Sequence, residues 1–356
     1  MPAIAFDARR ADAFAERMLG ILNGGALALM ISIGHRTGLF DVMKGLAPSR
    51  SDEIARRAGL EERYVREWLG ALVSGGIVTY DAERGLYALP REHAASLTRD
   101  ARPHNLAVTA QWIPILGAVE DEVIECFERG GGVSYAAYGR FHAVMAEDSD
   151  QTVVASLLEE IVPLVPGLPA ALESGIDVLD VGCGQGRALQ RLARAFPKSR
   201  FTGLDLSAEA ITAAKQEAAR LRLANLRFEV RDVAEITHEA AFDLVTAFDA
   251  IHDQARPADV LAALARALRP DGTFLMQEIA GTSRLEDDVQ HPLAPFLYTV
   301  SCLHCMSVSL AAEGDGLGAM WGEGTARAML AEAGFSRIDV RNLSHDPMNR
   351  YYVVRR

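Results

Sequence analysis

The sequence predicts an α/β fold with a seven-stranded, mostly parallel sheet, preceded by an α-helical and winged-helix domain. From residue 176 onward, short apolar runs typical of strands alternate with longer helical runs. Before that residue helical periodicity dominates, and one segment combines two helices with a hairpin. The 356 residues are enough for two domains at roughly 100–200 residues each.

The predicted sheet has seven strand-like runs. They are 176–181, 200–206, 226–232, 242–248, 273–279, 336–342 and 349–355. Helical runs lie between most of them, at 186–196, 207–223, 257–269 and 323–333. The last two strands are joined by a short turn, so they must pair antiparallel. We therefore expect a Rossmann-like sheet of parallel strands with one antiparallel strand.

The segment 51–89 has the pattern of a winged helix. A helix that ends at Gly59 is followed by a helix with Trp68 and Leu72 on its apolar face, and then by a hairpin over 77–89. A winged helix suggests DNA binding, but residues 50–100 contain eight arginines, no lysine and nine acids. Phosphate contacts need a surplus of positive charge. We therefore favour a dimerisation and substrate-capping role over nucleic-acid binding.

Composition limits the compartment and the partners. The net charge of −12 gives no overall attraction for nucleic acid or an anionic membrane. The longest apolar run, 26–33, is shorter than the roughly 20 residues of a membrane-spanning helix. Four cysteines are too few for a disulfide scaffold and suit a reducing cytoplasm.

We predict a winged-helix domain over 1–100, a helical connector over 101–170 and a sheet domain over 171–356.

The first strand leads into a glycine loop, 180-DVGCGQGRAL-189. Gly182, Gly184 and Gly186 allow a sharp turn and let a ligand approach the N-terminus of the next helix. A dinucleotide-binding loop would have glycine or alanine where this loop has Arg187. Asp180 precedes the glycines and can face a positively charged group, whereas it would repel a pyrophosphate.

Acidic residues stand at the ends of the next strands. Asp205 can accept bonds from both hydroxyls of a ribose. Asp232 can accept a hydrogen bond from the amino group of adenine, and the Val233 N–H can donate one to a ring nitrogen. Phe248 and Asp249 end the fourth strand, and all these residues lie where an open sheet binds ligands. A single such acid is more often a helix cap, but capping explains four acids and a glycine loop poorly.

With these residues the sequence resembles class I S-adenosylmethionine-dependent methyltransferases over about 171–356. The strand 242-FDLVTAFDAIH-252 and the phrase 268-LRPDGTFLMQE-278 add to the likeness, and the layout resembles a bacterial subgroup with an N-terminal winged helix. The resemblance implies S-adenosyl-L-methionine as cofactor, S-adenosyl-L-homocysteine as product, and a homodimer. The implied cofactor-binding residues are Asp180, Gly182, Cys183, Gly184, Gly186, Asp205, Leu206, Asp232, Val233, Phe248, Asp249 and Phe141.

The candidate catalytic residues follow strands four and five. Methyl transfer requires a nucleophile about 3 Å from the methyl group, and a base only if the nucleophile is protonated. His252 is a candidate base that Asp253 orients, and alternatively it shapes the cofactor site or caps the next helix. Glu278 ends the fifth strand, where we favour a hydrogen-bonding role that orients substrate or holds a loop.

An insertion at 281–321 lies above the carboxyl ends of the strands, the place of a lid or substrate wall. Its glycine-rich tail, 314–322, is expected to flex. The candidate substrate-lining residues are Tyr298, Cys302, His304, Cys305 and Trp321.

The cysteines of this insertion allow several interpretations. In an α-helix Cys302 and Cys305 lie about 60° apart on one face, and His304 points elsewhere. A structural zinc site needs four ligands, which this segment cannot supply, so no metal is expected. A redox pair is disfavoured because the two thiols are in mid-helix. Substrate contact and plain packing remain.

We interpret the sequence as a cytoplasmic methyltransferase with a small-molecule acceptor. The acceptor atom stays open between oxygen, nitrogen, carbon and sulfur, and the methionines and cysteines of the insertion keep a small thiol or sulfide among the candidates. Two alternatives belong to other classes. One is a nucleic-acid or protein methyltransferase, and the other is a ligand-sensing winged-helix transcriptional regulator without catalysis.

Overall fold

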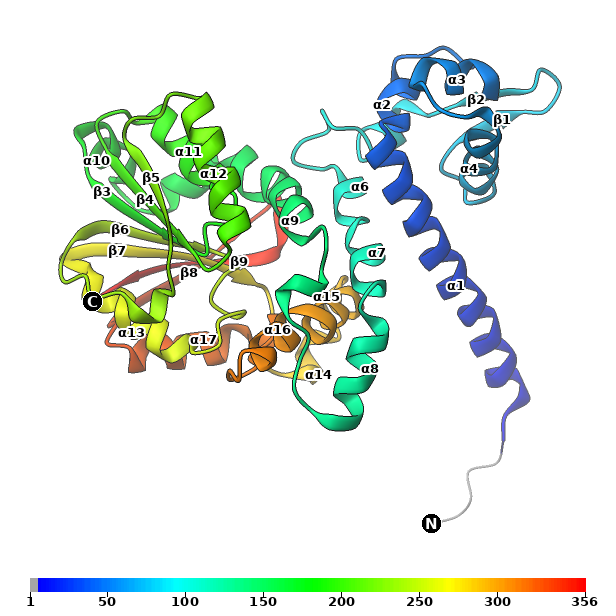
Figure 1. Ribbon diagram of the computed structural model, residues 1–356. Coiled ribbons are helices and arrows are strands. Elements are labelled where there is room, and N and C mark those ends of the chain that lie inside the picture. Colours follow the sequence, from blue (N-terminus) through cyan, green and yellow to red (C-terminus); the bar gives the residue numbers. More distant parts are fainter. Residues whose placement is uncertain (1–5) are drawn as a thin grey trace. The chain divides into compact units, whose positions relative to one another are not determined.

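The computed structural model describes residues 6–356 and consists of two compact units. The first unit ends at Pro114, and the second runs from Ile115 to Arg356. Helix α7 (Trp112–Gly117) crosses this division. Each unit has its own elements, which Figure 1 labels along the chain.

The first unit contains the predicted winged helix. Its elements are α1 (Ala8–Thr37), α2 (Leu39–Lys44), α3 (Ser51–Ala58), α4 (Glu62–Ser74), β1 (Thr79–Asp81), β2 (Leu86–Ala88), α5 (Arg91–Ala94) and α6 (Leu106–Thr109). The strands β1 and β2 form the antiparallel wing. Trp68 and Leu72 are buried in the core of this unit, as their helical spacing predicts. Gly34 allows α1 to pass close to this core, because a Cβ there would lie 2.6 Å from both Phe40 and Trp68.

Helix α1 is long, apolar and exposed. Asp7 caps its N-terminus, and among its 30 residues only Ser32, Gly34 and His35 are buried. By length and composition, α1 and the segment Ala294–Ala311 are each apolar enough to cross a membrane, a test that core helices also pass. The sequence prediction considered only uninterrupted apolar runs and therefore did not single out these two segments.

The second unit begins with helices and continues into the sheet. The helices before the sheet are α8 (Glu120–Arg129), α9 (Phe141–Ser149) and α10 (Leu168–Ser174). The strands are β3 (Asp177–Val181), β4 (Arg200–Asp205), β5 (Leu226–Val230), β6 (Phe242–Phe248), β7 (Leu268–Ile279), β8 (Arg337–Leu343) and β9 (Asp346–Arg355). The helices between them are α11 (Arg187–Ala195), α12 (Ala208–Arg220), α13 (Pro257–Ala267) and α17 (Gly322–Glu332).

The predicted sheet is confirmed, strand for strand. The order is β5-β4-β3-β6-β7-β9-β8, with β9 antiparallel to both of its neighbours. Alternate residues of β3 face opposite sides: Leu179 packs into a core with α13 and α17, whereas Val178 packs into a core with α11 and α12. Figure 1 shows these helix pairs on the two faces of the sheet.

The strand order places a candidate ligand site at the carboxyl end of β3. This strand lies between β4 and β6, so the chain crosses from one side of β3 to the other at this position. Ligands of open α/β sheets bind at such switch points. The carboxyl ends of β3, β4 and β6 therefore bring Asp180, Asp205 and Asp249 together along one edge of the sheet, the edge formed by the strand ends.

The insertion between β7 and α17 is mostly helical. It contains α14 (Leu285–Asp288), α15 (Ala294–Val300), a π-helical turn at Ser301–Cys305, α16 (Met306–Ala311) and a short 3₁₀ turn at Ala319–Trp321. The π turn inserts an extra residue into an otherwise α-helical path and so rotates everything that follows. Such turns often occur at functional sites.

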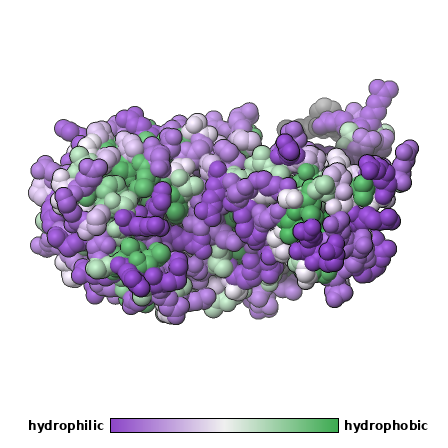
Figure 2. Space-filling model, turned by 90° about the horizontal axis from the view of Figure 1, so that it is seen from above, coloured by the Kyte–Doolittle hydropathy of each residue, from purple (hydrophilic) through white to green (hydrophobic). Residues whose placement is uncertain are grey.

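The face of the protein in Figure 2 is mainly hydrophilic, and hydrophobic residues form small separate groups on it. This pattern agrees with a chain in which 24% of residues are charged. Large exposed hydrophobic side chains are concentrated on α1 instead, and include Phe14, Leu19, Ile21 and Leu22.

The packing of α13 gives a prediction about stability. Leu264→Ala should lower the free energy of unfolding of the sheet unit by about 2–5 kcal/mol, because Leu264 is fully buried and its loss leaves a cavity. The matched control is Leu285→Ala, whose side chain is 63% exposed and which should change stability by about 0.5 kcal/mol or less. Urea denaturation followed by circular dichroism measures both, and equal losses would contradict this packing.

Candidate active site

The glycine loop after β3 has the geometry that only glycine accepts easily. Gly182, Gly184 and Gly186 have φ values of 64°, 51° and 70°. A Cβ at Gly182 would lie 2.4 Å from the Ala250 Cβ, and one at Gly186 would lie 2.2 Å from the Phe228 ring. The Cys183 N–H donates to the Leu204 carbonyl at 3.1 Å, which attaches the loop to β4.

Asp180 lies buried beneath this loop. Its Oδ1 accepts a bond from the Thr246 hydroxyl at 2.6 Å. Burial raises the pKa of Asp180 to about 7, although the bond from Thr246 lowers it, and the charge of Asp205 raises it further. A cation placed beside Asp180 would therefore stabilise its ionised form.

Asp205 links the end of β4 to the glycine loop. Its Oδ2 accepts the Gly184 N–H at 2.8 Å, and its Oδ1 accepts the Ser207 N–H at 2.8 Å. The N-cap of α12 is Ser207, so Asp205 is not the cap. Each carboxylate oxygen keeps further lone-pair capacity for another donor. The next residue, Leu206, is an apolar side chain that is 62% exposed at this edge.

Asp232 has a structural role at the end of β5. It caps the short 3₁₀ turn Val233–Glu235, with its Oδ1 accepting the Ala234 N–H at 2.8 Å. Its other oxygen forms an ion pair with the Arg256 Nη2 at 3.1 Å. The capping explanation thus fits this acid, and its contact with an adenine stays a prediction.

Asp249 follows Phe248 at the end of β6 in a strained backbone conformation. Its φ is 49°, in the left-handed region that non-glycine residues rarely adopt, and strain of this kind clusters at functional sites. The Asp249 N–H donates to the Gln277 carbonyl at 3.0 Å. Burial, together with the charge of Glu278, raises the pKa of Asp249 well above its usual value. Phe248 is only partly buried beside it.

The predicted catalytic residues form one buried cluster. His252 is 3% exposed, and its Nδ1 forms a short hydrogen bond with Glu278. Its Nε2 lies 3.2 Å from the Asp253 Oδ1. Glu278 also accepts the Ile251 N–H at 2.9 Å and the Trp321 Nε1–H at 3.2 Å. Glu278 thus fixes the imidazole and attaches the insertion to β7.

Two histidines around Asp253 differ in their pKa. Burial opposes the charged form of His252, but Glu278 and Asp253 raise its pKa well above the usual value. Burial lowers the pKa of His304 to about 4, although Asp253 raises it. The same surroundings therefore shift the two imidazole pKa values in opposite directions, upward for His252 and downward for His304.

The structure corrects the predicted faces of the insertion helix. The π turn places the consecutive residues His304 and Cys305 in the buried cluster around Asp253, while Cys302 is partly exposed. The prediction that Cys302 and Cys305 share a face from which His304 points away was wrong, because it assumed α-helical geometry. The sequence has no signal for a π turn, which arises from tertiary packing.

His304 packs in an aromatic cluster. The Phe141 ring stacks on its imidazole, with centroids 4.2 Å apart and planes at 10°. Phe141 was predicted to pass over the cofactor, and that role stays a prediction. Its ring lies against His304, in the cluster around Asp253.

Sequence reasoning missed the residues that precede Phe141. Tyr135 donates its hydroxyl to the Asp253 Oδ2 at 3.1 Å, and the Tyr138 ring lies 4.9 Å from His304. Gly132 brings this segment against the insertion helix, because a Cβ there would lie 1.9 Å from the Ser307 carbonyl oxygen. The available signal was the three-residue spacing of the aromatic residues at 135, 138 and 141.

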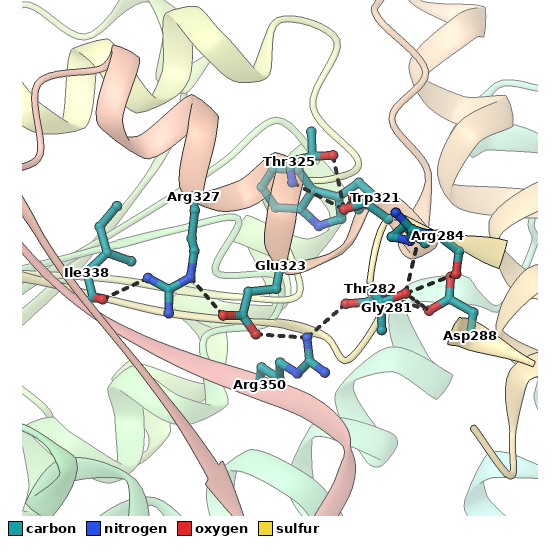
Figure 3. Close-up of polar contacts among 11 residues, drawn as sticks. Gly281, Thr282, Arg284, Asp288, Trp321, Glu323, Thr325, Arg327, Ile338 and Arg350 are labelled. Carbon is teal, nitrogen blue, oxygen red and sulfur yellow. Dashed lines mark hydrogen bonds and ion pairs between the residues drawn. The ribbon is translucent and has the colours of Figure 1, made fainter. Parts of the chain in front are cut away.

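Both ends of the insertion are fixed by polar contacts, drawn in Figure 3. Arg350 donates to the Gly281 carbonyl at 3.1 Å and to Glu323 at 3.0 Å. The Ser283 hydroxyl donates to the Trp321 carbonyl at 2.6 Å. The insertion is thereby held to strand β9 and to the start of α17.

Tyr298 and the glycine-rich tail also belong to the framework of the insertion. The Tyr298 hydroxyl donates to the Asp288 Oδ2 at 2.9 Å, and Asp288 in turn accepts the Thr282 N–H at 2.8 Å. In the tail, a Cβ at Gly318 would lie 2.4 Å from the Ser301 hydroxyl oxygen. The glycines thus allow close packing where the sequence suggested a flexible tail.

Family models match both units of the chain. Residues 25–99 match the Rv2258c-like winged HTH domain, and residues 172–320 match a methyltransferase domain. A trans-aconitate 2-methyltransferase of Acidovorax sp. (strain JS42) is 34% identical over 128 residues, covering 32% of this chain and 48% of that protein. A fatty-acid O-methyltransferase of Mycolicibacterium smegmatis is 36% identical over 102 residues, covering 28% and 36%. The chain thus spans about half or less of the length of these relatives.

Solved structures resemble the chain over nearly its whole length. A putative O-methyltransferase from Nostoc punctiforme has a TM-score of 0.71 at 18% identity, covering 96% of this chain and 98% of that one. Human N-acetylserotonin methyltransferase, crystallised with S-adenosylmethionine, has a TM-score of 0.69 at 15% identity, covering 100% and 99%. At these identities the likeness establishes the fold.

The buried carboxyl of Asp180 gives a prediction about pH. The pKa of Asp180 is higher in the folded than in the unfolded state, so ionisation of this carboxyl destabilises the fold. The wild-type protein therefore loses stability as the pH rises from about 4 to 7. Asp180→Asn removes this cost and keeps the acceptor for Thr246. The stability of the variant relative to wild type should therefore increase by about 2–3 kcal/mol between pH 5 and pH 8.

Urea denaturation at several pH values measures this difference. Asp339→Asn, at a side chain that is 67% exposed, is the control for losing a carboxylate. Stability profiles of Asp180→Asn and wild type that run parallel from pH 5 to pH 8 would contradict the raised pKa.

Proposed function

We propose that this chain, which has the fold and domain order of class I S-adenosylmethionine-dependent methyltransferases with an N-terminal winged helix, methylates a small molecule. One observation supports this most: the glycine loop and the carboxylates of Asp180, Asp205 and Asp249 converge at one edge of the sheet. The buried His252 cluster lies next to them in the chain, directly after Asp249. The strand ends can therefore bind a methyl donor, and the His252 cluster can bind the molecule that accepts the methyl group.

In this proposal the donor lies along the strand ends. Asp205, which already holds the Gly184 N–H, accepts the ribose hydroxyls. Leu206 and the Val233 segment contact the adenine. Asp180 faces the positive charge of the donor, whose binding then favours the ionised carboxylate. S-adenosyl-L-methionine supplies an already activated methyl group, and S-adenosyl-L-homocysteine is the product.

The acceptor is a small molecule in this proposal because the cluster is enclosed. His252, His304 and Cys305 are each 5% exposed or less. The insertion, which carries His304 and Cys305, packs against His252 and Asp253. The segment of Tyr135 and Phe141 packs against Asp253 and His304. A nucleic-acid strand or a protein loop would have to displace both. The acidic balance of residues 50–100 also disfavours nucleic acid.

The raised pKa of His252 bears on its role. A raised pKa favours the protonated imidazole, which is a hydrogen-bond donor and not a base. His252 therefore serves as a base only from its deprotonated form. Oxygen is our first choice of acceptor atom, since the similar proteins include O-methyltransferases, and a small thiol is the second choice.

We also propose a homodimer in the cytoplasm. Helix α1 leaves Phe14, Leu19, Ile21 and Leu22 more than half exposed, and a second copy of the same helix would bury them. All four cysteines are free thiols, which suits a reducing compartment.

Transfer of labelled methyl groups tests the activity. The full chain should label at least one member of a panel of small carboxylic acids, phenols and thiols, and should leave DNA, RNA and protein unlabelled. DNA binding without turnover would instead support the transcriptional regulator, and labelled nucleic acid or protein would contradict the small-molecule proposal.

The Asp205 carboxylate gives a matched test of donor binding. Asp205→Asn keeps an oxygen acceptor and removes the charge, so the affinity for S-adenosyl-L-homocysteine should fall by about 1.5–3 kcal/mol for a lost charge-assisted bond. Isothermal titration calorimetry measures this change. Asp339→Asn on the exposed edge strand is the control, and unchanged affinity in Asp205→Asn would mean that Asp205 does not contact the donor.

The exposed face of α1 gives a prediction about assembly. Leu22→Glu should raise the dimer dissociation constant at least about tenfold, since it places a charge in an apolar interface. Arg17→Glu is the control, as a charge change at an exposed position of the same helix. Analytical ultracentrifugation measures both. A monomeric wild type, or wild type that binds lipid vesicles through α1, would contradict the proposed dimer.

A further inference from the structure

We propose that His252, Asp253 and Cys305 form a Zn²⁺ site with one open position. Their ligand atoms, an imidazole nitrogen, a carboxylate oxygen and a thiol sulfur, all lie within 4.8 Å of one another. Two of the residues follow strand β6, and the third belongs to the π turn of the insertion. Zinc binds this combination of nitrogen, oxygen and sulfur ligands in proteins.

The distance between His252 and Asp253 fits two ligands of one ion. Their Nε2 and Oδ1 atoms are 3.2 Å apart. Two atoms about 2.0–2.1 Å from a tetrahedral zinc ion lie about 3.3 Å apart. The Asp253 Oδ1 is buried and has no hydrogen-bond partner in the part of the chain that the structure describes. The two atoms therefore have the spacing of ligands without the direction of a hydrogen bond.

The surrounding residues have the arrangement that orients metal ligands. The Nδ1 of His252 is bonded to Glu278, so its Nε2 is the atom that faces Asp253 and Cys305. A carboxylate in this position fixes the ring of a zinc-bound histidine. Tyr135 donates to the Asp253 Oδ2 and leaves the Oδ1 for the ion. Ile251 and Trp321 hold Glu278 in place.

Cys305 is the residue that distinguishes this site from an ordinary acid–histidine pair. It is 5% exposed, and the π turn places its side chain against His252 and Asp253. A thiol that binds a metal loses its proton, and the ion also replaces the proton at the His252 Nε2. Cys302, one turn earlier and partly exposed, lies outside this group.

Three protein ligands and one open position are typical of catalytic zinc. The role of that position rests on the proposed methyl transfer. This role applies to the second choice of acceptor atom, a small thiol, which would bind there through its sulfur and release its proton to solvent. An electron pair of its sulfur then forms a bond to the methyl carbon of the donor, and the electrons of the broken C–S bond return to the donor sulfur. The products are a methyl thioether and S-adenosyl-L-homocysteine, whose sulfur is uncharged.

The test measures metal binding without donor or acceptor. After treatment with a chelator and dialysis, the full chain should take up equimolar zinc by mass spectrometry. Cobalt in its place should show a sulfur-to-cobalt charge-transfer band, which requires a thiolate ligand. Cys305→Ser should abolish that band, and Glu278→Gln should weaken zinc binding about 10–100-fold.

Cys302→Ser is the matched control, because it removes a thiol from the same π turn and should leave zinc binding and the cobalt band unchanged. Asp253→Asn gives a second test if Cys305→Ser fails to fold. No charge-transfer band, or equal losses in the two cysteine variants, would overturn the site. Methyl transfer by zinc-free protein at the full rate would overturn its role, while zinc binding without any methyl transfer would count against the proposed function alone.

Discussion

The buried carboxylate of Glu278 is the contact on which the rest of the candidate site depends. It lies at the end of β7 and bonds to the backbone of Ile251, the imidazole of His252 and the indole of Trp321. Burying a carboxylate costs several kcal/mol unless hydrogen bonds and charge compensate it. Those three partners come from the exit of β6 and from the end of the insertion, so this compensation fixes the insertion above the sheet.

The sheet and its cofactor edge could be predicted because they depend on local patterns. Strand-like runs that alternate with helices specify the seven strands, and their carboxyl ends place Asp180 and Asp205 together without any knowledge of side-chain contacts. The tight loop could also be predicted, because Gly182 and Gly186 are part of a local sequence motif. Each of them permits a close approach that a Cβ would prevent. The roles of single acids are less predictable, as the capping by Asp232 shows.

The acceptor end could not be predicted because it depends on contacts between distant segments. The π turn at Ser301–Cys305 changes which residues face the sheet, and no local pattern encodes it. Tyr135 reaches Asp253 across more than a hundred residues of chain. Its segment follows the glycines at 130–132, and a glycine-rich turn has no periodicity from which a contact can be inferred.

A crystal structure of the full chain with S-adenosyl-L-homocysteine tests the central claim most directly. We expect the ribose hydroxyls on Asp205, the adenine beside Leu206 and Val233, and the sulfur directed from the glycine loop toward His252. The enclosed space beyond the sulfur should be lined by His304 and Cys305. Binding of the ligand at another edge of the sheet, or with the sulfur directed away from His252, would contradict this account.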